Sequence, residues 1–210
     1  DANKDNNAHA EGYQTLAYEA NSHAEGYQTL AYGKASHAEG ASTKAIGNNS
    51  HAEGNITEST GDYSHAEGRK TVASGTGAHT EGTGTLASGE WTHAEGNETK
   101  AQGSHAHSEG NKSEANGDYS HAEGLNTRAI ATSSHAEGSN SAASGEASHA
   151  EGNGTKSEGR GTHSEGFGSE ALLEAAHAEG YYSIAHSPYS HAGGYYSEAI
   201  GNASFAHGSN

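Results

Sequence analysis

The sequence predicts an all-β fold, a parallel β-solenoid of short coils, and three observations support this prediction. First, the tetrapeptide His-Ala-Glu-Gly or a close variant recurs every fourteen residues from His9 to His191, and Phe205 takes the next position. Second, only 30% of the 210 residues are hydrophobic and 31 are Gly, so the chain lacks the large apolar side chains that fill a compact domain. Third, the strict repeat argues against the disorder that low hydrophobicity and a net charge of -17 would otherwise indicate.

One repeat follows the pattern S-H-A-E-G-x-x-T-x-A-x-G-x-x, where x is variable. Small residues alternate with variable or polar ones in each half, and a period of two is the period of a β-strand. Gly and the Asn- and Asp-rich variable positions supply turns. We therefore expect two short strands per coil, with equivalent strands of successive coils paired in parallel about 4.8 Å apart. We expect residues 1–210 to be a single repetitive domain and an excerpt of a longer fibrous protein.

The alternation also predicts which side chains face inward. The Ser, Ala and Gly of the first strand and the Thr, Ala and Gly of the second are small, as the interior of a narrow coil requires. The outward position of the second strand varies widely and includes Leu16, Lys44, Glu58 and Val72, as solvent permits. The outward positions of the first strand are His and Glu in almost every repeat. An outward face that does not vary is expected to contact a partner that also repeats, and the simplest such partner is another copy of the chain.

The thin interior supports the same expectation of assembly. Ala, Ser, Thr and Gly bury little apolar area, while ordering the backbone costs about 1–2 kcal/mol per residue. We therefore predict a homotrimer in which the His and Glu side chains face the threefold axis. The predicted interface consists of His23, Glu25, His37, Glu39, His51, Glu53, His65, Glu67, His93, Glu95, His121, Glu123, His135, Glu137, His149 and Glu151.

The repeat resembles the head repeat of trimeric autotransporter adhesins of the YadA type, because S-H-A-E-G stands where that family typically has S-V-A-I-G. The resemblance covers essentially the whole chain, and it implies a left-handed parallel β-roll that assembles as a trimer for surface attachment. His and Glu replace two apolar residues, so a hydrophobic trimer interface does not carry over. His-Ala-Glu-Gly versions look like repeats in fibre and tail proteins of Gram-positive bacteria and their phages.

The function predicted from this resemblance is a non-enzymatic structural or adhesive fibre segment. It would belong to a bacterial surface adhesin, with a part in virulence, or to a phage tail fibre. The expected location is extracellular, at a cell surface or on a virion. The expected partners are other copies of the chain and a protein or carbohydrate of the host surface.

The repeated His and Glu also permit a second interpretation, a ligand-binding module that holds metal ions or anions along the axis. Imidazoles that converge from three chains are a recognised metal ligand set. The residues of this alternative are His23, His37, His51, His65, His93, His121, His135 and His149. A remote third interpretation is an ice-binding solenoid, because Thr recurs from Thr15 to Thr155, although its predicted inward position argues against this role.

Electrostatics adds an expectation about pH. Glu side chains stacked about 4.8 Å apart repel one another unless they are neutralised. We expect neighbouring protonated His to neutralise them, with a raised His pKa. The assembled protein would then gain stability as the pH falls toward about 6 and lose it as the pH rises through the raised pKa.

Other classes of function are disfavoured. The acidic chain lacks the basic patches that bind nucleic acid or anionic membranes, and no segment approaches the roughly 20 apolar residues of a membrane span. The chain has no Cys, so it lacks the P-C-x-x-C partner that H-A-E requires in zinc deaminases. H-E-x-x-H is absent, and a Ser-His-Glu trio that recurs many times is unlike a unique catalytic site. We therefore expect no enzymatic activity, no catalytic residue and no cofactor.

Aromatic residues cluster toward both ends of the chain, and single ones occur between them. Capping of the ends and packing between chains are the favoured roles for the aromatic residues. The alternative is contact with a host protein or carbohydrate, for which the candidates are the exposed turn residues Tyr63, Trp91 and Tyr119.

Overall fold

The structure is a computed structural model that describes residues 7–209, and residues 1–6 and 210 lie outside the described part. The chain divides into two compact units, one that ends at His105 and one that begins at Ala106. Each unit is all-β and holds two parallel sheets, so the predicted parallel β-solenoid with two strands per coil is confirmed. The repeat continues through both units, and the expectation of a single repetitive domain stays a prediction.

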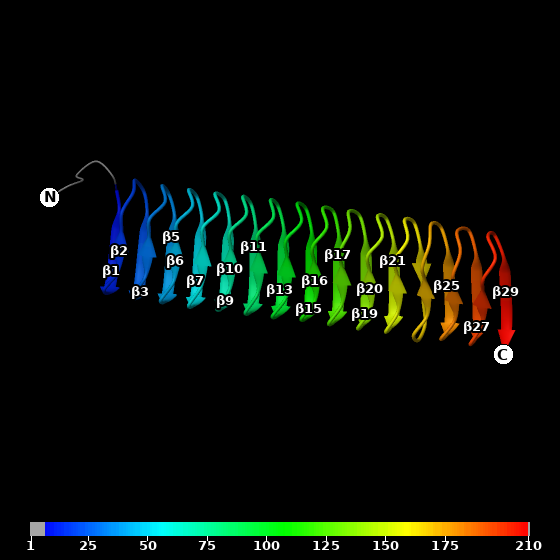
Figure 1. Cartoon of the computed structure of the whole chain (residues 1–210). Coiled ribbons are helices and arrows are strands. Elements are labelled where there is room, and N and C mark those ends of the chain that lie inside the picture. Colours follow the sequence, from blue (N-terminus) through cyan, green and yellow to red (C-terminus); the bar gives the residue numbers. More distant parts are fainter. Residues whose placement is uncertain (1–6, 210) are drawn as a thin grey trace. The chain divides into compact units, whose positions relative to one another are not determined.

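In the first unit, the strands that begin at each repeat His stack in sequence order into one sheet, and the short strands after them form a second sheet (Figure 1). Equivalent residues pair in register, as His51 does with His65 and Gly54 with Gly68. The first sheet contains β1 (His9–Tyr13), β3 (His23–Tyr27), β5 (His37–Ala41), β7 (His51–Asn55), β9 (His65–Arg69), β11 (His79–Thr83) and β13 (His93–Asn97). The second contains β2 (Leu16–Ala17), β4 (Leu30–Ala31), β6 (Lys44–Ala45), β8 (Glu58–Ser59), β10 (Val72–Ala73), β12 (Leu86–Ala87) and β14 (Lys100–Ala101).

The second unit repeats this arrangement with one irregular strand, β23, which has two residues where its equivalents have five. Its first sheet contains β15 (His107–Asn111), β17 (His121–Leu125), β19 (His135–Ser139), β21 (His149–Asn153), β23 (His163–Ser164), β25 (His177–Tyr181), β27 (His191–Tyr195) and β29 (Phe205–Ser209). Its second sheet contains β16 (Glu114–Ala115), β18 (Arg128–Ala129), β20 (Ala142–Ala143), β22 (Lys156–Ser157), β24 (Glu170–Ala171), β26 (Ile184–Ala185) and β28 (Glu198–Ala199).

The interior of a coil is filled by four small side chains. The Ala after the repeat His and the Ala of the second strand are fully buried, as Ala52 and Ala73 illustrate. The Ser or Thr before the His and the Thr of the second strand complete the interior, and Thr43 and Thr57 are among the largest fully buried side chains. The inward position predicted for these residues is confirmed. A buried Thr column cannot offer the exposed array on which the ice-binding alternative depends.

The first Gly of the repeat corrects the prediction that small size places this residue inside. Gly54 and Gly68 are exposed, and their φ angles are +108° and +103°. A Cβ atom on Gly54 would overlap the backbone carbonyl of Gly68 in the next coil. Gly is therefore required here by its backbone conformation and by the close approach of successive coils.

Each coil also turns at two residues with positive φ, of which one lies five residues after the His and the other two residues before the next His. Ile56 and Tyr63 occupy these positions in one coil, both with φ of 59°. Such a conformation costs a non-Gly residue about 1–2 kcal/mol. The Ser before the His stabilises the second of these turns, because the Oγ of Ser64 donates a hydrogen bond of 2.6 Å to the carbonyl of Gly61. Ser36 and Ser50 make the same contact at the same distance.

Candidate functional site

The candidate site is the outward face of the first sheet, which we call the His–Glu face. The repeat His and the Glu two residues later project from the same side of each strand, while the Ala between them points inward. These side chains are neither buried nor fully exposed: His51 is 34% exposed and Glu53 is 43% exposed. The structure therefore places the predicted interface residues on one continuous face within each unit. Contact between copies of the chain stays a prediction.

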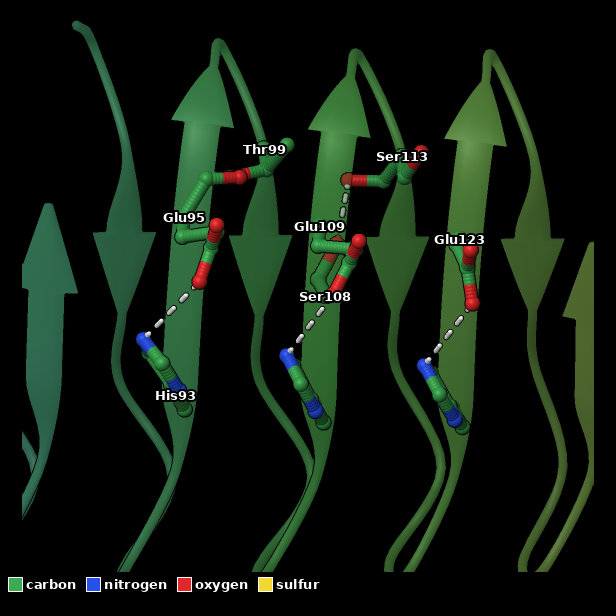
Figure 2. Close-up of polar contacts among 9 residues, drawn as sticks. His93, Glu95, Thr99, Ser108, Glu109, Ser113 and Glu123 are labelled. Atoms are coloured by element: carbon green, nitrogen blue, oxygen red, sulfur yellow. Dashed lines mark hydrogen bonds and ion pairs between the residues drawn. The ribbon is translucent and has the colours of Figure 1, made fainter. Parts of the chain in front are cut away.

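Within a coil, the His and the Glu lie side by side. The distance from the His Nε2 to the Glu Oε2 is 3.3 Å for His23 and Glu25, and 3.5 Å for His51 and Glu53. It is 3.9 Å in the coil of His121 and Glu123. Figure 2 shows this pair in the coils of β13, β15 and β17, where the ring nitrogen points toward the carboxylate. Most of these contacts are longer than a hydrogen bond, so the pairing within a coil is weak.

Between coils, the imidazole rings stack face to face. The ring centroids of His51 and His65 are 4.7 Å apart and the rings are inclined by 4°. The rings of His135 and His149 are 4.6 Å apart with the same inclination. This column is a direct consequence of the in-register parallel pairing, which places identical residues one strand spacing apart.

Within the single chain, the pKa of five histidines of the stacked column is lowered, in the opposite direction from the raised His pKa expected for the assembled protein. Burial is the largest cause and a neighbouring imidazole the second, while the Glu side chains act in the opposite direction with less effect. The histidines are His37, His51, His65, His135 and His177. Protonation of one ring places a charge beside another ring in a partly desolvated column, and carboxylates at these distances do not compensate.

For these histidines of the single chain, the linkage to stability therefore has the opposite sign from the one expected for the assembled protein, whose pH dependence stays a prediction. A His with a lowered pKa binds fewer protons in the folded state than in the unfolded state over the range between the two pKa values. The folded chain accordingly loses stability as the pH falls from about 6.5 toward the lowered pKa.

The regular pairing stops in the coils of β23, β25, β27 and β29, which we call the interrupted segment. Gly193 stands where the repeat has Glu, and Glu179 lies instead beside His191 and His207, with Oε1–Nε2 distances of 3.5 and 3.6 Å. A Cβ on Gly193 would lie 2.6 Å from Cδ2 of His207 and 2.9 Å from Oε1 of Glu179, so this rearrangement depends on the missing side chain. The rings of His177 and His191 are inclined by 34°.

The interrupted segment also brings two carboxyl groups together. One carboxylate oxygen of Glu165, one of Glu179 and a ring nitrogen of His177 all lie within 4.8 Å of one another. Desolvation raises the pKa of Glu179, but the interactions with Glu165, His191 and His177 outweigh this effect and the pKa is lowered. Glu151, Glu165 and Glu179, with the glycines beside them, line an open groove of about 550 Å³.

The three candidate surface residues occupy equivalent turns. Tyr63, Trp91 and Tyr119 are 63%, 57% and 63% exposed, and all have positive φ. Trp91 covers Gly77 of the preceding coil, where a Cβ would meet the indole ring. Their exposure agrees with the sequence-based expectation, and their contact with a host molecule stays a prediction.

Sequence reasoning missed two features of this face. The Ser before the His stabilises the turn by donating a hydrogen bond to the carbonyl of the Gly three residues earlier, which the spacing G-x-x-S could have indicated. The grouping of Glu165, His177 and Glu179 was also missed, and the replacement of Glu by Gly193 was its only signal in the sequence.

No protein-family model matches the chain, and no curated protein matches it either. The resemblance to the YadA-type head repeat therefore stays a prediction. Among residues 7–209, no helix has the length and apolar character needed to cross a membrane.

Proposed function

We propose that this chain is a structural segment of a homotrimeric fibre, either a bacterial surface adhesin or a phage tail fibre, built as a left-handed β-roll. One observation carries the proposal: the two outward faces of the same coils differ in how much they vary. The His–Glu face repeats the same two side chains in successive coils, whereas the second sheet places Lys44, Glu58 and Val72 at equivalent outward positions. Solvent alone does not require such uniformity.

The chemistry of the His–Glu face supports burial between copies. The Nε2 atoms of His51, His65 and His135 are shielded from solvent and have no hydrogen-bond partner among the described residues. The Glu of the same coil lies 3.5–3.6 Å from these atoms, and packing against a neighbouring chain would hold its carboxylate closer and reduce the cost of the missing hydrogen bond. In-register stacking would repeat the same contact in every coil, so the interface would be long and uniform.

The function that follows is mechanical. A repetitive trimer would hold a terminal binding module away from its anchor and present it in three copies, which raises the avidity for a surface. The exposed turn residues Tyr63, Trp91 and Tyr119 are the proposed adhesive contacts along the segment.

Light scattering coupled to size-exclusion chromatography tests the assembly. The purified chain should elute with three times its mass of 21.3 kDa. Charge reversal on the His–Glu face, Glu53→Lys with Glu67→Lys, should convert the trimer to a monomer. Each new Lys would be buried against the same Lys of the other two chains, and the carboxylates beside His51 and His65 would be lost. Glu58→Lys is the matched control, since Glu58 lies on the outer side of the second sheet.

A monomeric wild-type chain, or equal dissociation of the Glu58→Lys control, would contradict the proposed interface. The adhesive contacts are tested separately by Tyr63→Ala with Trp91→Ala. This double variant should remain trimeric and should lose binding to host cells or to an array of host glycans. Unchanged binding would confine the segment to a spacer role.

A further inference from the structure

The His–Glu face contains several groups of three potential metal ligands, and their geometries differ. In the first unit, one nitrogen or oxygen from each of His65, Glu67 and His79 lies within 4.8 Å of the other two. In the second unit, the same holds for Glu165, His177 and Glu179. The first group has two imidazoles and one carboxylate, whereas the second has one imidazole and two carboxylates.

Stacked imidazoles are poorly placed to share one metal ion. The lone pair of an imidazole nitrogen lies in the plane of the ring, and a bound Zn²⁺ sits along it at about 2.0–2.1 Å. The rings of His65 and His79 are 4.9 Å apart and inclined by only 8°, so their lone pairs run along nearly parallel lines. An ion bound by one ring is therefore out of reach of the other. The same argument applies to His135 and His149, which are inclined by 4°.

The group in the interrupted segment avoids this restriction. His177 supplies a single imidazole, and its Nε2 is shielded from solvent without a hydrogen-bond partner among residues 7–209. Glu165 and Glu179 come from the neighbouring coil and from the same coil, and their side chains rotate about single bonds to approach an ion in the plane of the ring.

The surroundings of these residues also favour a cation. The open groove is lined by Glu151, Glu165 and Glu179 and by glycines, and none of the lining residues is Lys or Arg. A carboxylate oxygen of Glu165 lies within 4.8 Å of one of Glu179, and two carboxylates this close repel when both are ionised. A divalent ion would cancel both charges at once.

We propose that Glu165, His177 and Glu179 bind one divalent transition-metal ion of the Zn²⁺ class. Two carboxylates and one neutral imidazole leave an open position for water, as three-ligand protein sites for such ions do. The ligand atoms need to move closer by small side-chain rotations, since bonds of about 2.1 Å bring neighbouring ligands to within about 3.5 Å of one another. The site is complete within one chain and does not rest on the proposed trimer.

Calorimetric titration of the full chain with Zn²⁺, supported by the visible absorption of bound Co²⁺, tests the proposal. One equivalent per chain should bind more tightly than all others. Glu165→Gln and His177→Gln should each weaken that binding by about tenfold or more. The matched controls are Glu67→Gln and His79→Gln in the regular column, and they should leave the affinity of the tight equivalent unchanged.

Far-UV circular dichroism of all four variants establishes that the coils remain folded. The proposal is overturned if several equivalents per chain bind with equal affinity, because the stacked column would then be the site. It is also overturned if Glu67→Gln weakens the tight equivalent as much as Glu165→Gln does, or if no tight equivalent exists in the folded wild-type chain.

Discussion

The coils of β5, β7, β9 and β11 and the interrupted segment share a backbone but differ in side-chain pairing. In the first region, Glu53 lies beside the His of its own coil, and the rings of His51 and His65 stack in parallel. In the interrupted segment, Glu179 lies beside His191 of the next coil, whose ring is tilted. Yet the first Gly of each coil stacks on the next coil in both regions. Backbone stacking therefore defines the coil, and the outward side chains can be rearranged by one substitution such as Gly193.

The largest predicted effect tests whether the two regions share their backbone stacking. Gly54→Ala in the regular region and Gly166→Ala in the interrupted segment should each destabilise the fold by about 3 kcal/mol. In both, the new Cβ would overlap a backbone carbonyl of the next coil, which cannot rotate away as a side chain could. Urea denaturation followed by circular dichroism measures the effect.

Gly161→Ala is the control for conformational strain alone. Gly161 has φ of +63° and open space around its Cβ position, so the change should cost only about 1 kcal/mol. Similar losses for Gly54→Ala and Gly161→Ala would show that close approach between coils is not the reason for the first Gly.

The next effect concerns pH and should be strongest in the regular region. The melting temperature should fall as the pH is lowered from about 7.5 to about 5.5, because histidines with lowered pKa must be protonated against burial and against each other. Replacing both His51 and His65 by Gln should flatten this dependence. The measurement is thermal denaturation at several pH values and constant ionic strength.

His186→Gln serves as the control, because His186 lies outside the stacked column. This variant should keep the pH dependence of the wild-type chain. A melting temperature that rises on acidification would contradict the lowered His pKa and would indicate that neighbouring Glu raise it.

The smallest predicted effect compares the buried hydroxyl groups of the two regions. Thr57 Oγ1 is buried without a hydrogen-bond partner among the described residues, whereas Ser169 Oγ donates to the carbonyl of Gly180 at 3.2 Å. Thr57→Val should be neutral or stabilising, and Ser169→Ala should destabilise by about 1 kcal/mol. Chemical denaturation of the two variants decides the matter, and an equal loss for both would mean that Thr57 is also hydrogen-bonded.

Most of the fold could be predicted from the sequence because the same fourteen-residue pattern recurs in every coil. The period of two in the strand halves identified Ala52 and Thr57 as inward residues, and repetition removed the ambiguity that a single short strand would carry. The alternation wrongly placed Gly54 in the interior. A Gly that fills an inward position and a Gly that is required by the close approach of two backbones cannot be distinguished in a sequence.

The candidate site was predicted less completely. Parity placed His51 and Glu53 on the outward face, but the protonation of His51 depends on ring stacking and burial, which are properties of the assembled column. Glu179 and His207 meet across Gly193, so one missing side chain allows a contact between coils that are not adjacent. Neither effect is local in the sequence.

The in-register pairing of identical residues has a further consequence for how the chain folds. Where His51 pairs with His65 and Gly54 with Gly68, a strand displaced by one whole repeat would meet the same residue types and form almost the same contacts. Such misaligned stacks are nearly degenerate with the native one and compete with it as kinetic traps. Positions that occur once break this degeneracy, among them Gly193 and the stacked rings of Phe167, Tyr181 and Tyr195. The irregular coils thereby specify the register in which the coils of an otherwise uniform chain stack.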